Sequence, residues 1–547
     1  MASVLERARA SLERAREVIR FTPARPRAPE ARDGDIVELF ETHVVTRLVD
    51  IASHAMRERG EAYYTICSAG HEGNGAIGRA TRTSDPSLLH YRSGAFFLER
   101  ARATGGAVDG ARDLLASLAG STADPISGGR HKVFGSIPLG ILPQTSTIAS
   151  HLPKAVGLAV AIERAARLGI ETPYPKDAIV VCSFGDASIN HSTAVGAMNA
   201  ASWVTFQKLP VPVLFVCEDN GLGISVRTPP GWIETRLRAL PGIEHVRADG
   251  TDPLAMLDAA RRAVEHVRST RSPVALHMAC VRLWGHAGSD ADTEYREAGE
   301  IAEVDARDPL LASSALVVSS GAMSPEAALA LVARHEARIA TLVEETIASK
   351  RIESRAEVVA PLARYSPERV KAEARAKGPP APAADRAAAE RAQPFGLAVR
   401  GGLAELLARY PQMLVFGEDV AQKGGVYGLT AGLWRRFGPK RVFNTLLDEQ
   451  TILGLALGAG MAGLLPFPEI QYLAYLHNAI DQVRAEAGTY PFLSAGQLAA
   501  PMVVRIAGMA SREGFGGHFH NENSLSSLRD VPGLVLGVPC RGDDAVA

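Results

Sequence analysis

Short apolar runs alternate with helix-patterned segments between about residue 36 and residue 310. Three of these runs, 177–184, 211–219 and 272–281, are rich in valine, alanine and leucine and do not alternate with polar residues. Such runs are typical of strands that are covered by helices on both faces of a sheet. Residues 192–207 have a helical pattern and lie between the first two runs, so we expect a parallel strand pair with a right-handed crossover.

A second α/β pattern begins after residue 395. Its predicted strands are 413–420, 465–475, 501–509 and 534–539, and residues 449–464 form a predicted helix of small residues that suits close packing. Between the two patterns, Ser324-Pro325-Glu326 is a helix-start signal, and a helix is predicted over 323–365. Residues 371–395 are rich in Ala, Pro and charge and predict a linker with some helix at its end.

These patterns predict an α/β protein with two doubly wound parallel-sheet domains joined by a helical, Ala/Pro-rich linker. We expect an N-terminal helical extension at 1–35, a first domain at 36–320, a helix and linker at 321–394, and a second domain at 395–547. The N-terminal helix is expected to be amphipathic and solvated. A further helix opens near Asp544, and the sequence ends inside it, so the second domain is expected to be truncated at its C-terminus.

Composition narrows the classes of function. The 547 residues are 46% hydrophobic and 22% charged, and 59 Lys and Arg stand against 60 Asp and Glu. This balance gives no sign of a nucleic-acid partner. The five cysteines are scattered, which fits buried thiols in a reducing compartment. No run approaches the ~18 apolar residues of a membrane span, and Glu6, Glu13 and Glu17 argue against a transit peptide, so we expect a cytoplasmic protein.

Polar residues follow two of the predicted strands directly. Gly185-Asp186 ends the first, and Asp219-Asn220-Gly221 ends the next. Parallel neighbours open their carboxyl ends to one crevice, where ligands bind. A carboxylate, an amide oxygen and a backbone carbonyl suit Mg²⁺, which takes its other ligands from phosphates and water. The pair therefore predicts a metal-bridged diphosphate, and the alternative is that both segments are ordinary turns.

Together these segments resemble the thiamine diphosphate motif, whose pattern begins Gly-Asp-Gly, with Ala187 in place of the glycine after the aspartate. Residues 89–97, 145–161 and 282–296 resemble the alpha subunit of the thiamine-dependent first component of 2-oxo acid dehydrogenase complexes. Residues 415–458, 469–483 and 520–534 resemble the beta subunit of the same enzyme. The chain is therefore similar to an alpha–beta fusion whose beta half lacks the family's C-terminal domain.

The resemblance implies roles for individual residues. Mg²⁺ would be held by Asp186, Asn220 and the carbonyl of Leu222, and phosphate oxygens by Arg92 and Arg282, for which a surface ion pair is the alternative. Glu449 would bond a ring nitrogen of the aminopyrimidine and start proton transfer; its alternative is a helix-start acid. The remaining implied cofactor contacts are Tyr91, Ile148, Gly185, Ala187, His286 and Tyr475, which is otherwise a core tyrosine.

His286 and His520 are the implied proton-transfer or substrate-binding histidines, and His518 and His131 are weaker candidates. The activity implied is oxidative decarboxylation of a 2-oxo acid, with acyl transfer to a lipoyl group of an acyltransferase core. Branched-chain substrates are preferred, with pyruvate dehydrogenase or acetoin-type activity as the alternative. A homo-oligomer, at least a dimer of fused chains, is expected. Two other classes stay open: a non-catalytic cofactor-binding scaffold or degenerate paralogue, and a transketolase-like transferase.

Overall fold

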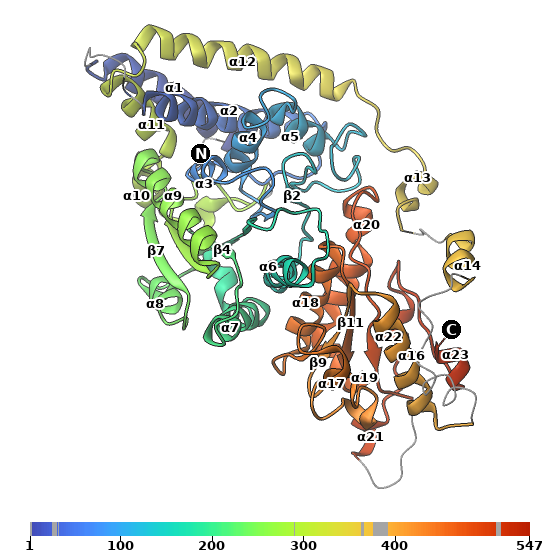
Figure 1. The fold of residues 1–547 in the computed structure, drawn as a ribbon. Coiled ribbons are helices and arrows are strands. Elements are labelled where there is room, and N and C mark those ends of the chain that lie inside the picture. The colour runs from blue at the N-terminus through green and yellow to red at the C-terminus, as the bar shows by residue number, and fades with distance from the viewer. Residues whose placement is uncertain are drawn as a thin grey trace.

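The fold is taken from a computed structural model that describes residues 3–24, 30, 32–288, 290–362, 366–375, 392–509 and 516–546. Two α/β units follow one another along the chain, and the second lies below the first in Figure 1. A six-stranded parallel sheet forms the centre of the first unit, and a four-stranded parallel sheet forms the centre of the second. This arrangement is the predicted α/β fold class.

Four long helices form a layer at the top of the molecule (Figure 1). They are α1 (Val4–Phe21), α2 (Asp33–Glu58), α11 (Pro309–Ser319) and α12 (Pro325–Ile347). A capping box of Ser3 and Glu6 starts α1, which buries Leu5, Leu12 and Ile19 against the neighbouring helices. The N-terminal helix is therefore amphipathic as predicted, but it is packed along one face and not solvated on all sides.

The six strands of the first sheet have the order β2-β1-β3-β4-β8-β7. Their bounds are β1 Ser87–Leu88, β2 Ile141–Leu142, β3 Val180–Gly185, β4 Val213–Asp219, β7 Glu244–Asp249 and β8 Val274–Ala279. Alternate side chains of β3 and β4 enter two different cores, because successive side chains of a strand point to opposite faces. Val181 and Leu214 join the core under α2 and α9, whereas Val180 and Phe215 join the core under α6 and α7.

The helices that cover this sheet include α6 (His151–Leu168), α7 (Ser192–Phe206) and α9 (Pro253–Thr270). The predicted parallel pair of strands, with a helix between them, is β3–α7–β4. The remaining elements of this unit are α3 (Asn74–Ala80), α4 (Gly94–Arg102), α5 (Gly110–Ala119), β5 (Leu222–Gly223), β6 (Val226–Arg227), α8 (Trp232–Arg238) and α10 (Ala298–Ala306). Short 3-10 turns lie at Asp186–Asn190 and Asp292–Glu294.

The helix predicted over 323–365 is too long, because α12 ends at Ile347. Ser354 and Glu357 form a second capping box, which starts a separate short helix, α13 (Arg355–Val359). Capping residues end and restart a helix because their side chains satisfy backbone N–H groups that the helix leaves unpaired. Helix α14 (Pro367–Arg375) follows, and residues 376–391 of the predicted linker lie outside the described residues.

The second sheet has the order β10-β9-β11-β12. Its strands are β9 Met413–Gly417, β10 Val442–Asn444, β11 Leu465–Ile470 and β12 Arg505–Ile506. Around it lie α16 (Phe395–Arg409), α17 (Leu433–Phe437), α18 (Glu449–Met461), α19 (Leu473–Leu476), a π-helix (Gln482–Gly488), α20 (Tyr490–Leu493), α21 (Gly517–His520), α22 (Ser526–Arg529) and α23 (Gly542–Val546). Further 3-10 turns lie at Val426–Gly428 and His477–Ala479. Helix α23 is the helix that the sequence predicted near its end.

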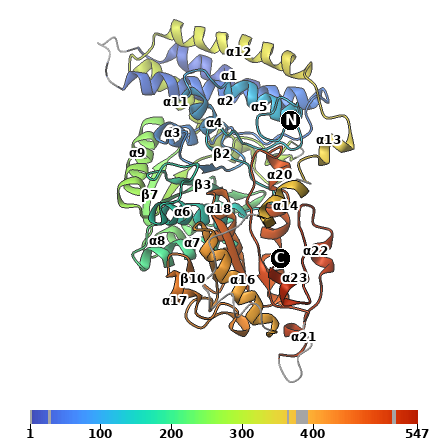
Figure 2. The same ribbon diagram turned by 45° about the vertical axis from the view of Figure 1, so that its right-hand side comes forward.

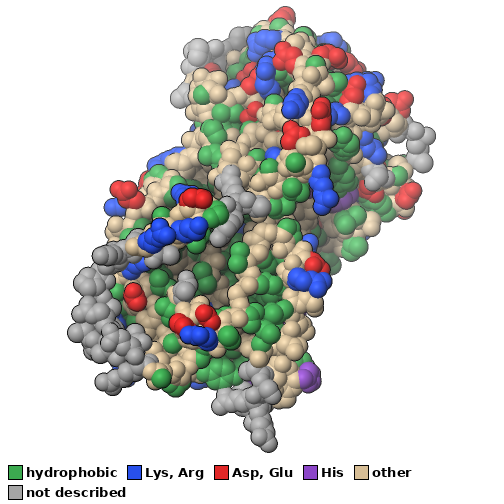
Figure 3. All heavy atoms as spheres, turned by 90° about the vertical axis from the view of Figure 1, so that its right-hand side faces the viewer, with side chains coloured by type: hydrophobic (Ala, Val, Ile, Leu, Met, Phe, Trp, Pro, Cys, Tyr) green, Lys and Arg blue, Asp and Glu red, His purple; other side chains and the backbone are tan. Residues whose placement is uncertain are grey.

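Two of the strands predicted in this half are too long, and a third is absent. The strand predicted over 465–475 ends at Ile470, and only Arg505 and Ile506 of the segment 501–509 pair with a neighbour. Residues 534–539 form no strand, and Val535, Leu536 and Val538 are exposed. On the face in Figure 3, charged side chains gather in the upper part, whereas hydrophobic side chains are spread over the lower part, which is the C-terminal half. An apolar segment becomes a strand only where a partner strand is available.

Helices α6 and α18 join the two units, and they lie side by side in Figures 1 and 2. A Cβ atom on Gly454 would lie 2.2 Å from Cβ of Pro153, and one on Gly458 would lie 2.1 Å from the amide nitrogen of Leu158. The glycines therefore let the two backbones approach closely. Ile452, Leu453 and Ala456 enter the same core as α6 and α7. No helix among the described residues has the length and apolar character of a membrane span.

Candidate active site

Asp186 and Asn220 lie at the same edge of the first sheet. Strands β3 and β4 are parallel neighbours, and Gly185 is paired with Glu218, so the residues that follow them emerge side by side. The carboxylate of Asp186 is 1% exposed and accepts a hydrogen bond from Thr228 Oγ1 at 2.5 Å. A Cβ atom on Gly223 would lie 2.6 Å from Cβ of Ala187, so the loop after β4 folds closely over the turn after β3.

Asn220 is held at both ends of its amide group. Its Nδ2 lies 3.1 Å from His71 Nε2, and its Oδ1 accepts a hydrogen bond from the backbone N–H of Leu222 at 3.1 Å. Gly221 has a φ of +75°, a left-handed conformation that brings Leu222 back toward Asn220. The strand-end turns therefore collect a carboxylate, an amide oxygen and nearby backbone carbonyls at one place.

The electrostatics of this edge fit a bound cation. Burial raises the pKa of Asp186, and the nearby carboxylate of Asp219 raises it further. A positive ion beside the two carboxylates would offset this repulsion and favour the ionised form of Asp186. The available donors are oxygens, which are the ligands that Mg²⁺ prefers. The residues present therefore fit a Mg²⁺ ion held by Asp186, Asn220 and the carbonyl of Leu222.

Two buried arginines stand next to this edge. Arg92 is 1% exposed and donates to the carbonyls of Cys67 and His286, both at 2.7 Å. Arg282 is 2% exposed and donates to the carbonyl of Ile224 and to the hydroxyl of Tyr295, also at 2.7 Å. The alternative of a surface ion pair is therefore wrong, and among the described residues no carboxylate forms an ion pair with either arginine.

The positive charge of the two arginines is not paired with a carboxylate of the described residues, so it can attract an anionic ligand. Burial lowers the pKa of Arg282, and the neighbouring Arg92 lowers it further, so the two cations repel each other. An anion placed between them would offset the cost of burying both charges. Diphosphate oxygens are suitable acceptors, because guanidinium groups bond them in a fork-shaped geometry.

Tyr91 and His286 face each other beside these arginines. Their ring centroids are 5.8 Å apart in an edge-to-face arrangement, and the Arg92 guanidinium lies 5.3 Å from the centre of the Tyr91 ring. Burial lowers the pKa of His286 to about 4, with Arg92 and Arg282 acting in the same direction. His286 is therefore neutral near pH 7, with one ring nitrogen as a hydrogen-bond donor and the other as an acceptor.

A cavity of about 590 Å³ opens beside Tyr91 and His286. Ile148, Ser188 and the weaker candidate His131 also line it, together with the loop 144–149, in which Ala149 has a φ of +65°. None of the described lining residues is Asp or Glu. The volume is in the range of small-molecule sites, and the absence of acids in this lining suits an anionic ligand.

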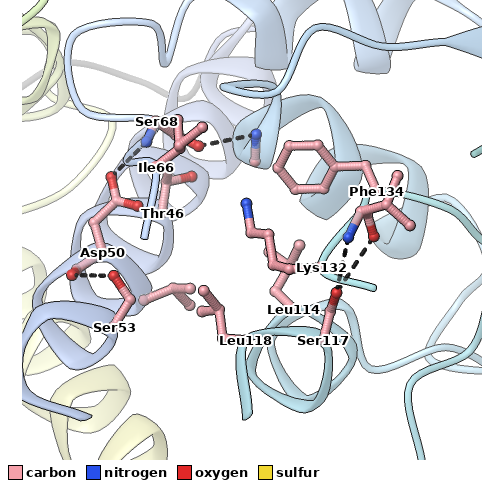
Figure 4. A pocket seen from close by; sticks show the side chains of 13 residues that line it. Thr46, Asp50, Ser53, Ile66, Ser68, Leu114, Ser117, Leu118, Lys132 and Phe134 are labelled. Atoms are coloured by element: carbon pink, nitrogen blue, oxygen red, sulfur yellow. Dashed lines mark hydrogen bonds between the residues drawn. The ribbon is translucent and has the colours of Figure 1, made fainter. Parts of the chain in front are cut away.

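A smaller cavity of about 30 Å³ lies behind the first, and Lys132 lines both. Figure 4 shows Lys132 extending its amine into this space, with Asp50 across the cavity. Burial raises the pKa of Asp50 to about 7, although the Ser68 N–H donates to it at 2.9 Å. Burial also lowers the pKa of Lys132. Sequence reasoning missed this pair, because the two residues are 82 positions apart (132 − 50) and carry no local motif.

Glu449 lies in the C-terminal half as the first residue of α18 and is 8% exposed. Asp448 caps the helix, and the side-chain amide of Asn478 donates to Glu449 Oε2 at 3.0 Å. Glu418, which the sequence analysis did not select, is close by. Burial raises the pKa of Glu418 to about 7, and Glu449 contributes in the same direction. Two acids of this half therefore share one site.

The other candidates of the C-terminal half form a cluster of rings. The hydroxyl of Tyr475 lies 3.2 Å from His520 Nε2, and the ring centroids of Tyr472 and His520 are 4.5 Å apart. His518 packs against Phe519, with centroids 4.1 Å apart. The described lining of the large cavity comes from residues 63–352, so Glu449, Tyr475 and His520 are not part of it. The chain thus carries the candidates in two groups, one in each half.

Comparisons with known proteins match the two halves separately. Residues 41–354 match the family model described as dehydrogenase E1 component, and residues 392–547 match that of the pyrimidine binding domain of transketolase. The 2-oxoisovalerate dehydrogenase subunit alpha of Bacillus subtilis is 29% identical over 303 residues, which are 54% of this chain and 85% of that protein.

Similar beta subunits cover the second half. The 2-oxoisovalerate dehydrogenase subunit beta of Pseudomonas aeruginosa is 37% identical over 148 residues, which are 27% of this chain and 42% of that subunit. The pyruvate dehydrogenase E1 component subunit beta of Staphylococcus epidermidis is 37% identical over 153 residues, which are 27% of this chain and 45% of that subunit. The chain therefore spans less than half the length of the beta subunits that it matches.

Proposed function

Because this chain belongs to the family of dehydrogenase E1 components, we propose that it catalyses the oxidative decarboxylation of a 2-oxo acid with thiamine diphosphate and Mg²⁺. The observation that carries the proposal is the combination of Asp186 and Asn220 at one strand edge with Arg92 and Arg282 buried beside it. Divalent-ion ligands next to uncompensated buried cations suit a metal-bound diphosphate. Both matched families are families of thiamine diphosphate-binding proteins.

Each half of the chain has its own part in this proposal. The region 36–320 would hold the metal and the diphosphate, with Tyr91, Ile148, Gly185 and Ala187 around them. The region 395–547 would hold the aminopyrimidine ring, with Tyr475 packed against it. Bound thiamine diphosphate supplies a carbon nucleophile and an electron sink for the loss of carbon dioxide.

Glu449 would hydrogen-bond a nitrogen of the pyrimidine ring and share a proton with it. Neutral His286 would take up or release a proton beside the substrate, and His520 would act from the other half. Arg130, Lys132 and Arg351, which line the large cavity, would attract the substrate carboxylate, because no described lining residue carries a negative charge. These residues bind, orient and exchange protons, and the walls of the cavity exclude water.

The proposed assembly and partner follow from the division of the candidate residues between the two halves of the chain. The described lining of the cavity comes from one half alone, so a second copy of the chain would bring Glu449 and Tyr475 to it. A dimer of fused chains would then form two complete sites. The acyl group would pass to a lipoyl group of an acyltransferase component, which is the proposed partner.

The substrate class is proposed as branched-chain 2-oxo acids, since relatives of both halves are 2-oxoisovalerate dehydrogenase subunits. Pyruvate is the second candidate, since one relative of the second half is a pyruvate dehydrogenase subunit. Turnover of 2-oxoisovalerate and pyruvate with an artificial electron acceptor separates them. We expect kcat/KM for 2-oxoisovalerate to exceed that for pyruvate, and a ratio below one would reverse the assignment.

Calorimetric titration with thiamine diphosphate tests whether the protein binds the proposed cofactor. We expect binding with Mg²⁺ present and much weaker binding without it. Cofactor binding without turnover of any 2-oxo acid would favour a transketolase-like transfer or a cofactor-binding scaffold. No binding under either condition would overturn the proposed cofactor and with it the proposed reaction.

A further inference from the structure

His71, His90 and Glu218 form a buried polar cluster behind Asn220, and His90 also lines the large cavity. All three side chains are buried, and Glu218 lies on β4 two residues before Asn220. His71 Nδ1 lies 2.7 Å from Glu218 Oε2, and His90 Nδ1 lies 3.5 Å from the same oxygen. Ser93 Oγ donates to the other carboxylate oxygen, Glu218 Oε1, at 3.2 Å. Glu218 is therefore held in place from several directions.

The short contact between His71 and Glu218 is a hydrogen bond and not a pair of metal ligands. Two ligand atoms that each lie 2.0–2.2 Å from a tetrahedral zinc ion are separated by about 3.3–3.6 Å. The 2.7 Å separation of His71 Nδ1 and Glu218 Oε2 is well below that range. It matches a charge-assisted N–H···O⁻ bond, so the proton of the imidazole sits on Nδ1.

The tautomer of His71 determines what its other nitrogen can do. With the proton on Nδ1, Nε2 is an acceptor and receives a hydrogen bond from Asn220 Nδ2 at 3.1 Å. The opposite orientation of the Asn220 amide would place its NH₂ group against the backbone N–H of Leu222, which now donates to Oδ1. Both contacts therefore favour one orientation, in which the amide nitrogen is occupied and the oxygen faces the loop 220–222.

We propose that His71 is a positioning residue that fixes the amide of Asn220, so that its oxygen and not its nitrogen is presented to the divalent cation. The chain of contacts is Glu218, His71 and then Asn220; Glu218 and His71 are buried, and Asn220 is half-buried. Partners that orient a metal ligand from behind are worth 10–100-fold in metal affinity in other proteins. The inference rests on the proposed function, because it concerns a cation at Asp186 and Asn220.

Binding of Mn²⁺ in the presence of thiamine diphosphate, followed by electron paramagnetic resonance, tests this role without measuring activity. We expect His71→Leu to weaken Mn²⁺ binding about 10-fold or more. His71→Gln should stay within about threefold of wild type, because its amide can accept from Asn220 and donate to Glu218. His266→Leu, on α9 and away from the cluster, is the matched control and should bind Mn²⁺ as wild type does.

A double-mutant cycle shows whether the effect passes through Asn220. In an Asn220→Ala background, adding His71→Leu should cause no further loss of Mn²⁺ affinity. A further loss of the same size would overturn the inference, as would unchanged binding by folded His71→Leu. His71→Asn, which is too short to reach both partners, should lose the same affinity and replaces His71→Leu if that variant does not fold. Failure of the wild-type protein to bind Mn²⁺ with thiamine diphosphate would instead overturn the proposed function.

Discussion

Arg92 and Arg282 place two guanidinium groups inside the protein, where an isolated charge is costly. Their hydrogen bonds go to backbone carbonyls and to the Tyr295 hydroxyl, which are neutral acceptors. Neutral acceptors satisfy the N–H groups but do not compensate the charge. The two arginines therefore support the proposed anion site of the first unit, which lies next to the proposed cation site of Asp186 and Asn220.

A substitution of Glu449 can separate cofactor binding from turnover of the 2-oxo acid. Replacing Glu449 with Gln keeps the shape of the side chain and its contact with Asn478 but removes the exchangeable carboxyl proton. We expect turnover of the 2-oxo acid to fall by about 10²-fold or more, because acid–base groups contribute on that scale. Cofactor affinity, measured by calorimetry, should change little. Glu405→Gln, on the exposed side of α16, is the control, and a Glu449→Gln enzyme with most of its activity would contradict the assignment.

Asp50 gives the stability of the protein a defined pH dependence. Its pKa of about 7 in the folded state lies above the ordinary value of 3.8, so the folded state holds the proton more tightly than the unfolded state. The contribution of Asp50 to stability is therefore largest at low pH and is lost as the pH rises from about 4 through 7. The loss is on the order of a few kcal/mol, since one pKa unit corresponds to about 1.4 kcal/mol.

Asp50→Asn removes this titration but keeps an acceptor for the Ser68 N–H. We expect the melting temperature of the variant to rise relative to wild type between pH 5 and pH 8. Asp530→Asn, an exposed position next to Arg529, should show no such trend. A constant difference between Asp50→Asn and wild type across this range would show that Asp50 is already ionised in the folded protein.

The contact between α6 and α18 depends on the absence of side chains. Gly454→Ala would place a Cβ atom 2.2 Å from Cβ of Pro153, and the helices would have to separate. We expect a loss of about 1–3 kcal/mol or more in the free energy of unfolding, as for other overpacked cores. Gly401→Ala in α16 meets open space and should stabilise by up to about 1 kcal/mol, because alanine favours a helix. Urea denaturation compares the two, and equal effects would contradict a glycine-dependent contact.

Elements with strong local signals were predictable, and those that depend on distant partners were not. The apolar runs of β3, β4 and β8 and the small-residue pattern of α18 are visible in the sequence, because both faces of these elements are buried. Residues 534–539 have the same apolar character but pair with no strand in the described part of the chain. Pairing depends on what lies beside a segment, which a local pattern does not contain.

The residues of the candidate site also differ in whether a local sequence signal identifies them. Asp186 and Asn220 could be placed together because both end parallel strands, whose carboxyl ends meet at one edge. His71, Asp50 and Glu418 could not, since each acquires its role from residues far away in the sequence. The burial of Arg92 and Arg282 was equally invisible, because a charged residue in a sequence is by default a surface residue.

At the scale of the whole molecule, one polypeptide carries two units that match an alpha and a beta subunit of separate relatives. The candidate residues remain divided between these units, with the large cavity lined from the first alone within the described residues. In the proposed assembly a second copy of the chain completes each site, so we expect activity to depend on association of the chains.

The glycine-lined crossing of α6 and α18 has a consequence for the role of the peptide connection between the two units. The units contact each other through that crossing, through the core that they share and through the buried ion pair of Lys154 and Glu486. Covalent continuity then acts as a tether: it raises the effective concentration of one partner near the other without creating the surface by which they recognise each other. Two unlinked polypeptides with the same helices would adopt the same docking geometry, and fusion would alter only the dilution at which they come apart.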